Sequence, residues 1–364
     1  MNSATETVHV DLGARSYDVI VGEQLLASTG ERAQALGLGK RCAVITDSNV
    51  GPHFLETVET SLHESGIEVS AVTVPAGEAS KSMSVVEDVC RQLLRAGLDR
   101  KSFVVALGGG VIGDLAGFCA AVLNRGIPFI QIPTTVVSLV DSSVGGKTGV
   151  NAPEGKNLLG AFHQPRVVLG DVSTLKTMPD REYREGFAEA IKHAAIRDAE
   201  MVDLLEAQGP DNREGLVPLI ARNVAIKARV VAEDEKETSG VRALLNFGHT
   251  IGHAFEGAAG YGQLLHGEAV SIGTMAALRL SESIGGLSSE ESERIQQLLA
   301  QFRLPQDVSS EFKSAEVLEL MKRDKKFEEG KIRFVLLRKL GDAFVSDDVT
   351  QADIEREVER LIIV

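Results

Sequence analysis

Apolar and polar residues follow a different pattern in each half of the chain. The pattern of the first half predicts strands that alternate with helices. In the first half, short alternating or continuously apolar runs are separated by segments with helical spacing. We predict strands at "TVHVDL", "YDVIVG", "RCAVITD", "EVSAVTVP", "KSFVVALGGG" and "IPFIQIPTT". Strands that alternate with helices form a parallel sheet that binds ligands at its carboxyl ends. The first half is therefore expected to be an α/β domain.

In the second half, apolar residues recur almost only at helical spacing. This holds for the segments 180–208, 216–237, 269–285 and 292–302, whereas "IRFVLL" is the clearest strand candidate. The stretch "TMPDRE" offers a turn and a helix start, so we place a boundary near Thr177–Asp180. The prediction is an α/β domain over 1–178 and a mostly α-helical domain over 179–364.

Composition restricts the class of protein. With 364 residues, 43% hydrophobic and 25% charged, the chain suits two globular domains. No apolar run is long enough for a membrane span, and the N-terminus lacks the pattern of a secretory signal. The net charge of -14 argues against nucleic-acid binding but allows a local cationic pocket for a small anion. The odd number of cysteines (Cys42, Cys90 and Cys119) favours core thiols in the cytoplasm over disulfides or a zinc knuckle.

A glycine-rich turn is the first candidate binding element. In "VVALGGGVIGDLAGF", Gly108, Gly109 and Gly110 follow a strand and precede a helix whose first turn holds Gly113 and Asp114. Glycines let a ligand approach the backbone, and a helix start presents free N–H groups to a diphosphate. The alternative is a tight turn with small residues for packing. Because the pattern is not G-x-G-x-x-G, the motif alone does not name NAD.

Other polar residues follow strands or lie in one dense run. Asp47 ends a predicted strand, where it could bind a ribose hydroxyl or cap a turn, and Glu78 and Lys81 lie in a glycine-containing loop. The run from Ile132 to Pro165 carries apolar flanks, which favours a partly buried, ligand-binding loop over a solvated one. Its polar residues are Thr134, Thr135, Asp141, Ser142, Lys147, Asn151, Lys156 and Asn157.

Histidines and glutamates of the second half suggest a divalent metal. In "LLNFGHTIGHAFE", His249 and His253 lie one helical turn apart. The H-E-x-x-H protease pattern is disfavoured because Thr250 follows the first histidine. Spacing does not choose two ligands among the three histidines, and each could instead be a packed helix residue. The candidates are Glu189, His193, His249, His253, His266 and Glu268.

Several long motifs together resemble one family. They are "GGGVIGDLAGF", "IPTTVVSLVDSSVGGKTGVN", "GKNLLGAFHQP", "GFAEAIKHA", "LLNFGHTIGHAFE" and "LHGEAVSIG", and the resemblance covers nearly the whole chain. The sequence is similar to the 3-dehydroquinate synthase family of the shikimate pathway. The resemblance implies an N-terminal Rossmann-like domain that binds NAD and a mostly α-helical C-terminal domain that binds Zn²⁺ or Co²⁺. It also implies a homodimer.

The resemblance assigns site residues motif by motif. The metal ligands would be Glu189, His249 and His266, whereas His253 would fall to the substrate pocket. The NAD contacts would be Asp47, Glu78, Lys81, Gly109, Gly110, Val111, Asp114, Thr134, Thr135, Asp141, Ser142, Lys147, Lys156 and Thr177. The substrate residues would be Lys147, Asn157, Lys192, Lys227, Arg242, Asn246, His253 and Lys326, the last favoured over Lys325. Arg125 would reach the phosphate from the partner subunit.

The implied reaction is a lyase reaction without net redox change. It turns 3-deoxy-D-arabino-heptulosonate 7-phosphate into 3-dehydroquinate and phosphate, through transient oxidation by NAD, phosphate elimination, re-reduction and aldol closure. A polyol dehydrogenase of related architecture would not need the lysine and arginine set. Another sugar phosphate cyclase would change Arg242, Asn246 or His253, and an inactive nucleotide-binding relative would have lost a ligand.

Overall fold

The chain folds into two compact units and passes between them three times. The computed structural model describes residues 5–260, 263–323, 327–328 and 331–363. The first unit consists of Met1–Met178 and Gly215–Lys236, and the second of Pro179–Glu214 and Glu237–Val364. None of the helices in the described ranges combines the length and apolar character that a membrane span requires.

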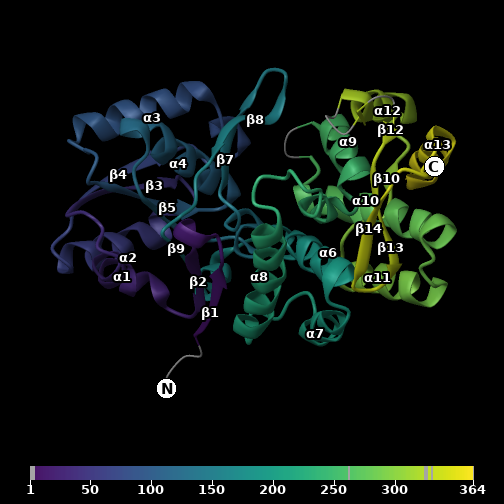
Figure 1. Ribbon diagram of the computed structural model, residues 1–364, viewed down its shortest axis with the longest axis horizontal. Coiled ribbons are helices and arrows are strands. Elements are labelled where there is room, and N and C mark those ends of the chain that lie inside the picture. The colour runs from purple at the N-terminus through teal and green to yellow at the C-terminus, as the bar shows by residue number, and fades with distance from the viewer. Residues whose placement is uncertain (1–4, 261–262, 324–326, 329–330, 364) are drawn as a thin grey trace. The chain divides into compact units, whose positions relative to one another are not determined.

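A seven-stranded sheet organises the first unit, with the strand order β1-β2-β9-β6-β5-β3-β4 (Figure 1). β1 runs antiparallel to β2, and the other neighbouring strands are parallel. The strands are β1 (Glu6–Val10), β2 (Tyr17–Gly22), β3 (Arg41–Asp47), β4 (Glu68–Val74), β5 (Phe103–Gly108), β6 (Phe129–Pro133) and β9 (Val167–Asp171). β1 to β6 correspond to the six predicted strands, so the expected α/β fold is confirmed.

Helices cover both faces of this sheet because its inner strands are apolar on both sides. Successive residues of a strand point to opposite faces, so Ala43 and Ile45 belong to one core and Cys42 and Val44 to the other. Helices α3 and α4 pack on the first face, and α1 and α2 on the second (Figure 1). Their bounds are α1 (Thr29–Ala35), α2 (Gly51–Glu64), α3 (Met83–Arg95) and α4 (Gly110–Val122).

The polar run 132–165 is more regular than the loop expected there. β7 (Lys147–Ala152) and β8 (Gly155–Phe162) form an antiparallel hairpin. Gly149 pairs with Gly160, and a Cβ atom on Gly160 would lie 2.2 Å from a carbonyl oxygen of β7. Part of the glycine content therefore allows two strands to pack closely.

Helix α8 (Leu216–Glu233) belongs to the first unit although the residues before it belong to the second. It packs against β1 and β2. Its buried positions include a stripe at helical spacing, formed by Leu216, Leu219, Ile220, Asn223, Val224, Lys227, Val230 and Val231. The chain leaves the first unit after Met178, but the single predicted boundary misses this return. Periodicity identified the helix and could not identify the surface that covers its apolar stripe.

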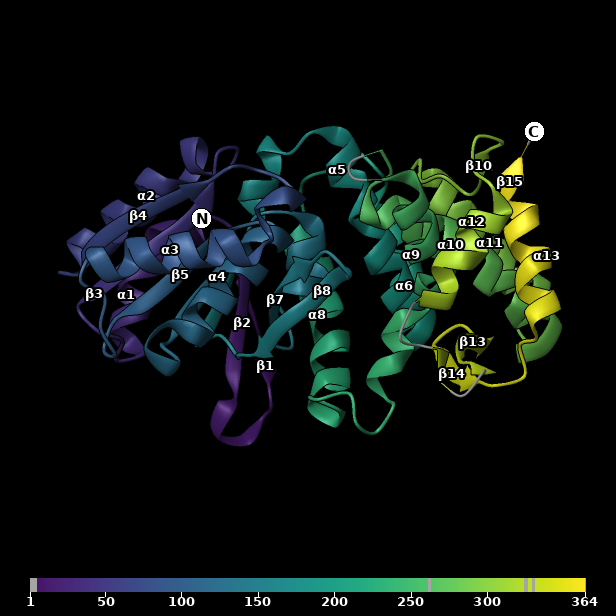
Figure 2. The ribbon, with the colours of Figure 1, turned by 90° about the horizontal axis from the view of Figure 1, so that it is seen from above.

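The second unit is mostly α-helical, as expected, with short two-stranded pairs (Figure 2). Its helices are α5 (Asp180–Glu185), α6 (Phe187–Arg197), α7 (Glu200–Gln208), α9 (His249–Ala259), α10 (His266–Leu280), α11 (Ser289–Gln301), α12 (Ser314–Arg323) and α13 (Gln351–Leu361). Its strands are β10 (Val308–Ser309), β11 (Phe327–Glu328), β12 (Lys331–Ile332), β13 (Phe334–Lys339), β14 (Asp342–Ser346) and β15 (Ile362–Ile363). β13 contains most of the strand predicted at "IRFVLL".

Helices α9 and α10 approach each other at glycines. A Cβ atom on Gly273 would lie 1.9 Å from the carbonyl oxygen of Gly248. A Cβ atom on Gly252 would lie 2.6 Å from the carbonyl oxygen of Ala269. Neither position has room for a larger residue, since the obstructing atoms belong to the backbone. Gly248 precedes His249 directly, so this close approach sets where the first turn of α9 meets α10.

Candidate active site

The glycine turn connects β5 directly to α4. Gly108 ends the strand and Gly110 begins the helix, so the free N–H groups of the helix start follow the strand's carboxyl end. A Cβ atom on Gly109 would lie 3.0 Å from a side-chain carbon of Thr135, and one on Gly110 would lie 3.2 Å from the Ser142 hydroxyl. The glycines thus let the turn lie against the segment after β6. Such a helix start can bind phosphate groups.

Three buried hydroxyl groups on this segment have no hydrogen-bond partner among the described residues. They belong to Thr134, Ser142 and Ser143. Leaving a buried hydroxyl unpaired costs roughly 1–3 kcal/mol, so such groups usually meet a ligand or water. The unpaired hydroxyls and the glycine turn together fit a ligand rich in hydroxyl and phosphate oxygens, as a dinucleotide is.

Lys81 joins three segments of the first unit through one buried ammonium group. Its Nζ donates to Asp114 Oδ2 at 2.8 Å and to Asn157 Oδ1 at 2.5 Å. Nζ also lies 3.8 Å from Glu78 Oε1, which accepts a hydrogen bond from Asn151 Nδ2 at 2.8 Å. Burial raises the pKa of Asp114, and the charge of Lys81 opposes that shift. Three predicted cofactor residues and one predicted substrate residue therefore lie together.

Asp47 and Thr177 make local backbone contacts. Asp47 Oδ1 accepts hydrogen bonds from the N–H groups of Asn49 at 2.8 Å and Val50 at 3.0 Å. The Thr177 hydroxyl donates to the carbonyl oxygen of Thr174 at 3.0 Å. Asp47 therefore caps a turn, which was one of the two roles expected for it. The cofactor roles of both residues stay predictions.

The other residues expected at the cofactor or phosphate occupy the surface of the same unit or the helix start. Val111 lies in the first turn of α4, and Lys147 and Lys156 are exposed on the β7–β8 hairpin. Arg125 is exposed and has a φ of 69°, a left-handed conformation uncommon for a residue with a side chain. Its contact with a partner subunit stays a prediction.

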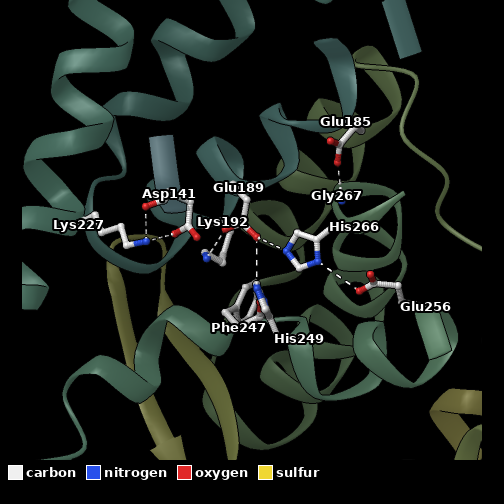
Figure 3. A network of polar contacts seen from close by, with 10 residues as sticks. All are labelled: Asp141, Glu185, Glu189, Lys192, Lys227, Phe247, His249, Glu256, His266 and Gly267. Atoms are coloured by element: carbon white, nitrogen blue, oxygen red, sulfur yellow. Dashed lines mark hydrogen bonds and ion pairs between the residues drawn. The ribbon is translucent and has the colours of Figure 1, made fainter. Parts of the chain in front are cut away.

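Lys227 of α8 forms an ion pair with Asp141. Its Nζ lies 2.7 Å from Asp141 Oδ1, and it also donates to the backbone carbonyl of Asp141 (Figure 3). Asp141 lies in the π-helical turn η5 (Ser138–Ser142), and Lys227 occupies one of the buried positions of α8. The return of α8 to the first unit thus brings a predicted substrate residue to a predicted cofactor residue.

Glu189 is a buried carboxylate that faces two imidazole rings of the second unit (Figure 3). Its Oε1 lies 3.2 Å from His249 Nε2 and 3.2 Å from His266 Nε2. The three possible ligand atoms lie within 4.8 Å of one another, and they come from α6, α9 and α10. One carboxylate and two imidazoles are a usual ligand set for a catalytic zinc ion that keeps a position open. These residues therefore fit a divalent metal ion.

The electrostatics of this group favour bound positive charge. Burial would raise the pKa of Glu189, but the charge of Lys192 and contacts with both histidines hold it well below its usual range. Burial lowers the pKa of His249. Burial would also lower the pKa of His266, but the carboxylates of Glu189 and Glu256 outweigh it and raise the pKa to about 10. A proton or a divalent cation bound here can neutralise the negative charge of the carboxylates.

Each of the two histidines has an acceptor at its other ring nitrogen. His249 Nδ1 lies 3.1 Å from the carbonyl oxygen of Phe247, and His266 Nδ1 lies 3.3 Å from Glu256 Oε2 (Figure 3). Such acceptors orient metal-binding histidines. Sequence reasoning missed Glu256, although its position seven residues after His249 places both on one face of a helix.

His253 belongs to a second possible ligand group. Its ring centroid lies 5.1 Å from that of His249 and 5.8 Å from that of His266. His253, Glu256 and His266 also bring one ligand atom each within 4.8 Å of one another. His253 is exposed, unlike Glu189 and His249. The more buried group is the better candidate for a resident ion.

The two remaining metal candidates have other surroundings. Glu268 accepts a hydrogen bond from Arg181 Nε at 2.7 Å and one from the N–H of Leu265 at 2.9 Å, so it holds the first turn of α10. His193 is fully buried one turn after Glu189 on α6. Neither belongs to the group formed by Glu189 with His249 and His266.

The predicted substrate residues of the second unit lie close to this group in sequence. Lys192 is buried and forms an ion pair with Glu189. Arg242 is buried, and its Nε lies 3.7 Å from Glu237 Oε1. Asn246 ends the short helix η7 (Arg242–Asn246), directly before the segment that leads to α9. Lys325 and Lys326 lie outside the described residues.

Glu185 is a further carboxylate that sequence reasoning did not single out. Its Oε2 accepts a hydrogen bond from the N–H of Gly267 at 2.6 Å, in the first turn of α10 (Figure 3). Burial raises the pKa of Glu185 to about 7, against the opposing effect of His266. No spacing rule connects Glu185 with Gly267, because the contact depends on how α5 packs against α10.

Comparison with known proteins supports the resemblance seen in the motifs. Residues 71–185 match the family model "3-dehydroquinate synthase N-terminal", and residues 186–327 match "3-dehydroquinate synthase C-terminal". A 3-dehydroquinate synthase from Nitrobacter winogradskyi is 46% identical over 355 residues, which cover 94% of this chain and 92% of that protein.

Two solved structures of synthases share the fold over nearly the full length. A 2-deoxy-scyllo-inosose synthase complexed with carbaglucose-6-phosphate, NAD⁺ and Co²⁺ is 25% identical with a TM-score of 0.88, covering 98% of this chain and 100% of its own. A 2-epi-5-epi-valiolone synthase from Streptomyces hygroscopicus with NAD⁺ and Zn²⁺ bound is 32% identical with a TM-score of 0.86, covering 95% and 96%. The chain therefore belongs to the 3-dehydroquinate synthase family.

Proposed function

We propose that this chain converts 3-deoxy-D-arabino-heptulosonate 7-phosphate into 3-dehydroquinate and phosphate, with NAD and a divalent ion, Zn²⁺ or Co²⁺, as cofactors. The full-length similarity to proteins of that name supports the reaction. The structural relatives solved with NAD⁺ and Co²⁺ or Zn²⁺ support the cofactors. The observation that carries the proposal is the buried Glu189 carboxylate facing the imidazoles of His249 and His266.

When bound, NAD⁺ supplies a reversible hydride acceptor and the metal supplies a Lewis acid, which together allow a transient ketone beside the C–H bond that must break. In this proposal Glu189, His249 and His266 hold the ion. The glycine turn and the unpaired hydroxyls of the first unit would hold the dinucleotide, with Asp47, Glu78, Lys81, Gly109, Gly110, Val111, Asp114, Thr134, Thr135, Asp141, Ser142, Lys147, Lys156 and Thr177 as its contacts.

Cationic side chains would bind the anionic ends of the substrate. Arg125 and Lys147 attract the phosphate, while Lys192, Lys227 and Arg242 attract the carboxylate or ring hydroxyls. The proposal adds Asn157 and Lys326 at the phosphate. Asn246 and His253 orient the ring, and His253 moves a proton, because an exposed imidazole can exchange that proton with water.

The first test measures phosphate release from the heptulosonate phosphate in the presence of NAD. We expect release by the metal-loaded protein, loss of release with a chelator, and recovery with Zn²⁺ or Co²⁺. Glu189→Gln should lower the rate by at least about 100-fold, because it removes the charged ligand. Glu282→Gln, an equal charge change at an exposed residue beyond α10, is the control.

Other enzyme activities that this fold could support predict different results in the same assay. A polyol dehydrogenase would accumulate NADH in proportion to the oxidised polyol and would release no phosphate. A cyclase with another product would prefer a different sugar phosphate. Release of phosphate without 3-dehydroquinate, or steady accumulation of NADH, would contradict the proposed function.

We also propose that the protein acts in the cytoplasm as a homodimer in which Arg125 reaches the partner's substrate phosphate. The exposed side chain of Arg125 and its left-handed backbone conformation support a role outside its own fold. A monomer in analytical ultracentrifugation at full activity would contradict the dimer.

A further inference from the structure

We propose that Glu256 is a positioning residue of the metal site, whose carboxylate accepts the Nδ1 proton of His266 and thereby keeps Nε2 free to bind the ion. The inference rests on the metal site of the proposed function and adds a residue to it. Glu256 would not bind the ion itself.

The geometry places His266 between two carboxylates. Its Nε2 lies 3.2 Å from Glu189 Oε1, and its Nδ1 lies 3.3 Å from Glu256 Oε2 (Figure 3). A neutral imidazole carries one proton, so the nitrogen that binds a metal requires the proton on the other. An acceptor at Nδ1 selects the tautomer that binds the ion through Nε2.

His249 and His266 differ in the kind of acceptor that lies at Nδ1. At His249 the acceptor is the backbone carbonyl of Phe247, a neutral group fixed two residues away in the chain. At His266 the acceptor is a charged carboxylate, which raises the electron density of the imidazole more than a carbonyl does. The side chain of Glu256 is only 14% exposed, so water screens this charge weakly.

Helix α9 carries both the ligand His249 and the acceptor Glu256. His249 lies in its first turn and Glu256 lies seven residues later, on the same face. Because α9 packs against α10 through Gly252 and Gly273, the carboxylate on one helix lies beside His266 on the other. One helix thus supplies a ligand and the acceptor that orients a second ligand.

Glu256 could instead bind the ion directly, because it forms a possible ligand group with His253 and His266. The exposed position of His253 disfavours that group relative to the buried carboxylate of Glu189. A ligand and a positioning residue also respond differently to substitution. Loss of a ligand changes the coordination sphere, whereas loss of a positioning residue weakens binding within the same sphere.

The experiment titrates metal-stripped protein with Co²⁺ and Zn²⁺, measuring the dissociation constant by chelator competition and the visible Co²⁺ absorption bands. We expect Glu256→Ala to weaken binding by about 10- to 100-fold. Glu256→Gln keeps an acceptor oxygen and should lose less. Both variants should retain the wild-type Co²⁺ bands, whereas Glu189→Gln should shift them. Glu282→Gln should match wild type, since it lies about 24 Å from His266 by helical rise.

The outcomes separate this inference from the proposed function. Wild-type affinity in both Glu256 variants would overturn the inference and leave the metal site intact. A shift of the Co²⁺ bands in Glu256→Gln, as large as in Glu189→Gln, would make Glu256 a ligand and also overturn it. Failure of wild type to bind either ion would remove the metal site and the inference together. Unfolding midpoints of the metal-free variants establish that each one folds.

Discussion

At the scale of single residues, three glutamates around His266 have the same chemistry and different environments. Glu189 is fully buried, yet the charge of Lys192 and the neighbouring imidazoles keep it ionised. Glu256 faces the other side of the His266 ring. Glu185 has a backbone N–H as its partner, and burial raises its pKa to about 7. Residue type alone therefore predicts neither the charge nor the role of a carboxyl group here.

Glu185 should make the stability of the metal-free protein fall as the pH rises from about 4.5 to about 7. The unfolded chain releases this proton near the ordinary value of 4.5, whereas the folded chain keeps it up to about 7. The folded state binds more protons in this window, so the free energy of unfolding decreases with pH. Glu185→Gln lacks this titration and keeps an oxygen that can accept the hydrogen bond.

Urea titrations at several pH values test this prediction. The free energy of unfolding of Glu185→Gln relative to wild type should increase across the window and become constant above it. A difference that is independent of pH between 4.5 and 7 would show that the Glu185 carboxyl has an ordinary pKa.

At the scale of elements, the contact between α9 and α10 determines where the two histidines meet. Gly273 and Gly252 each face a backbone carbonyl of the other helix at a distance that excludes a Cβ atom. The ring centroids of His249 and His266 lie 5.5 Å apart next to this contact. The distance between two candidate ligands therefore depends on glycines that carry no chemistry of their own.

Gly273→Ala should separate these helices and weaken metal binding. The added Cβ atom would lie 1.9 Å from the carbonyl oxygen of Gly248, so the backbone has to move. We expect a loss of stability of about 3 kcal/mol, at the upper end of the usual cost of overpacking, and weaker Co²⁺ binding in the same titration.

Gly257→Ala on α9 is the matched control, because its Cβ atom would make an ordinary contact 3.5 Å from Leu320. It should leave metal affinity unchanged and stability equal or up to about 1 kcal/mol higher, since alanine favours a helix. Equal effects of the two substitutions would contradict the role of the α9–α10 contact.

The sequence could predict elements and motifs better than contacts. Strand alternation located β1 to β6, and the order of strand, glycines and helix located the turn at Gly109. The β7–β8 hairpin was missed because the dense polar residues of the run 132–165 suggested a partly buried, ligand-binding loop, whereas Gly149 and Gly160 pair in two strands. Glu185 was not predicted because its contact with α10 joins residues that no periodicity connects. Contacts of that kind depend on tertiary packing.

At the scale of the whole molecule, the two units do not correspond to two continuous halves of the sequence. The first unit includes α8, which follows a segment of the second unit in the chain. α8 covers β1 and β2 with a buried stripe, and its Lys227 pairs with Asp141. A cut at the predicted boundary near Thr177–Asp180 would therefore remove part of the first unit.

A fragment of residues 1–178 should fail to unfold cooperatively. Joining residues 215–236 to it through a flexible linker should restore a cooperative transition, because α8 again covers the apolar side chains of β1 and β2. The joined fragment with Ile220→Asp and Val224→Asp is the control, since it keeps the length and loses the apolar contact. Circular dichroism recorded during heating measures the midpoint and the cooperativity of unfolding for each fragment. Equal cooperative midpoints for all three fragments would contradict the role of α8.

The position of α8 also affects how the protein is made. A ribosome releases the chain from the N-terminus, so Pro179–Glu214 emerge before the helix that completes the first unit. At about 5–20 residues per second, the nascent sheet waits several seconds with the surface that α8 covers open to solvent. During that interval it offers an apolar site to chaperones, and to neighbouring nascent chains on the same messenger RNA.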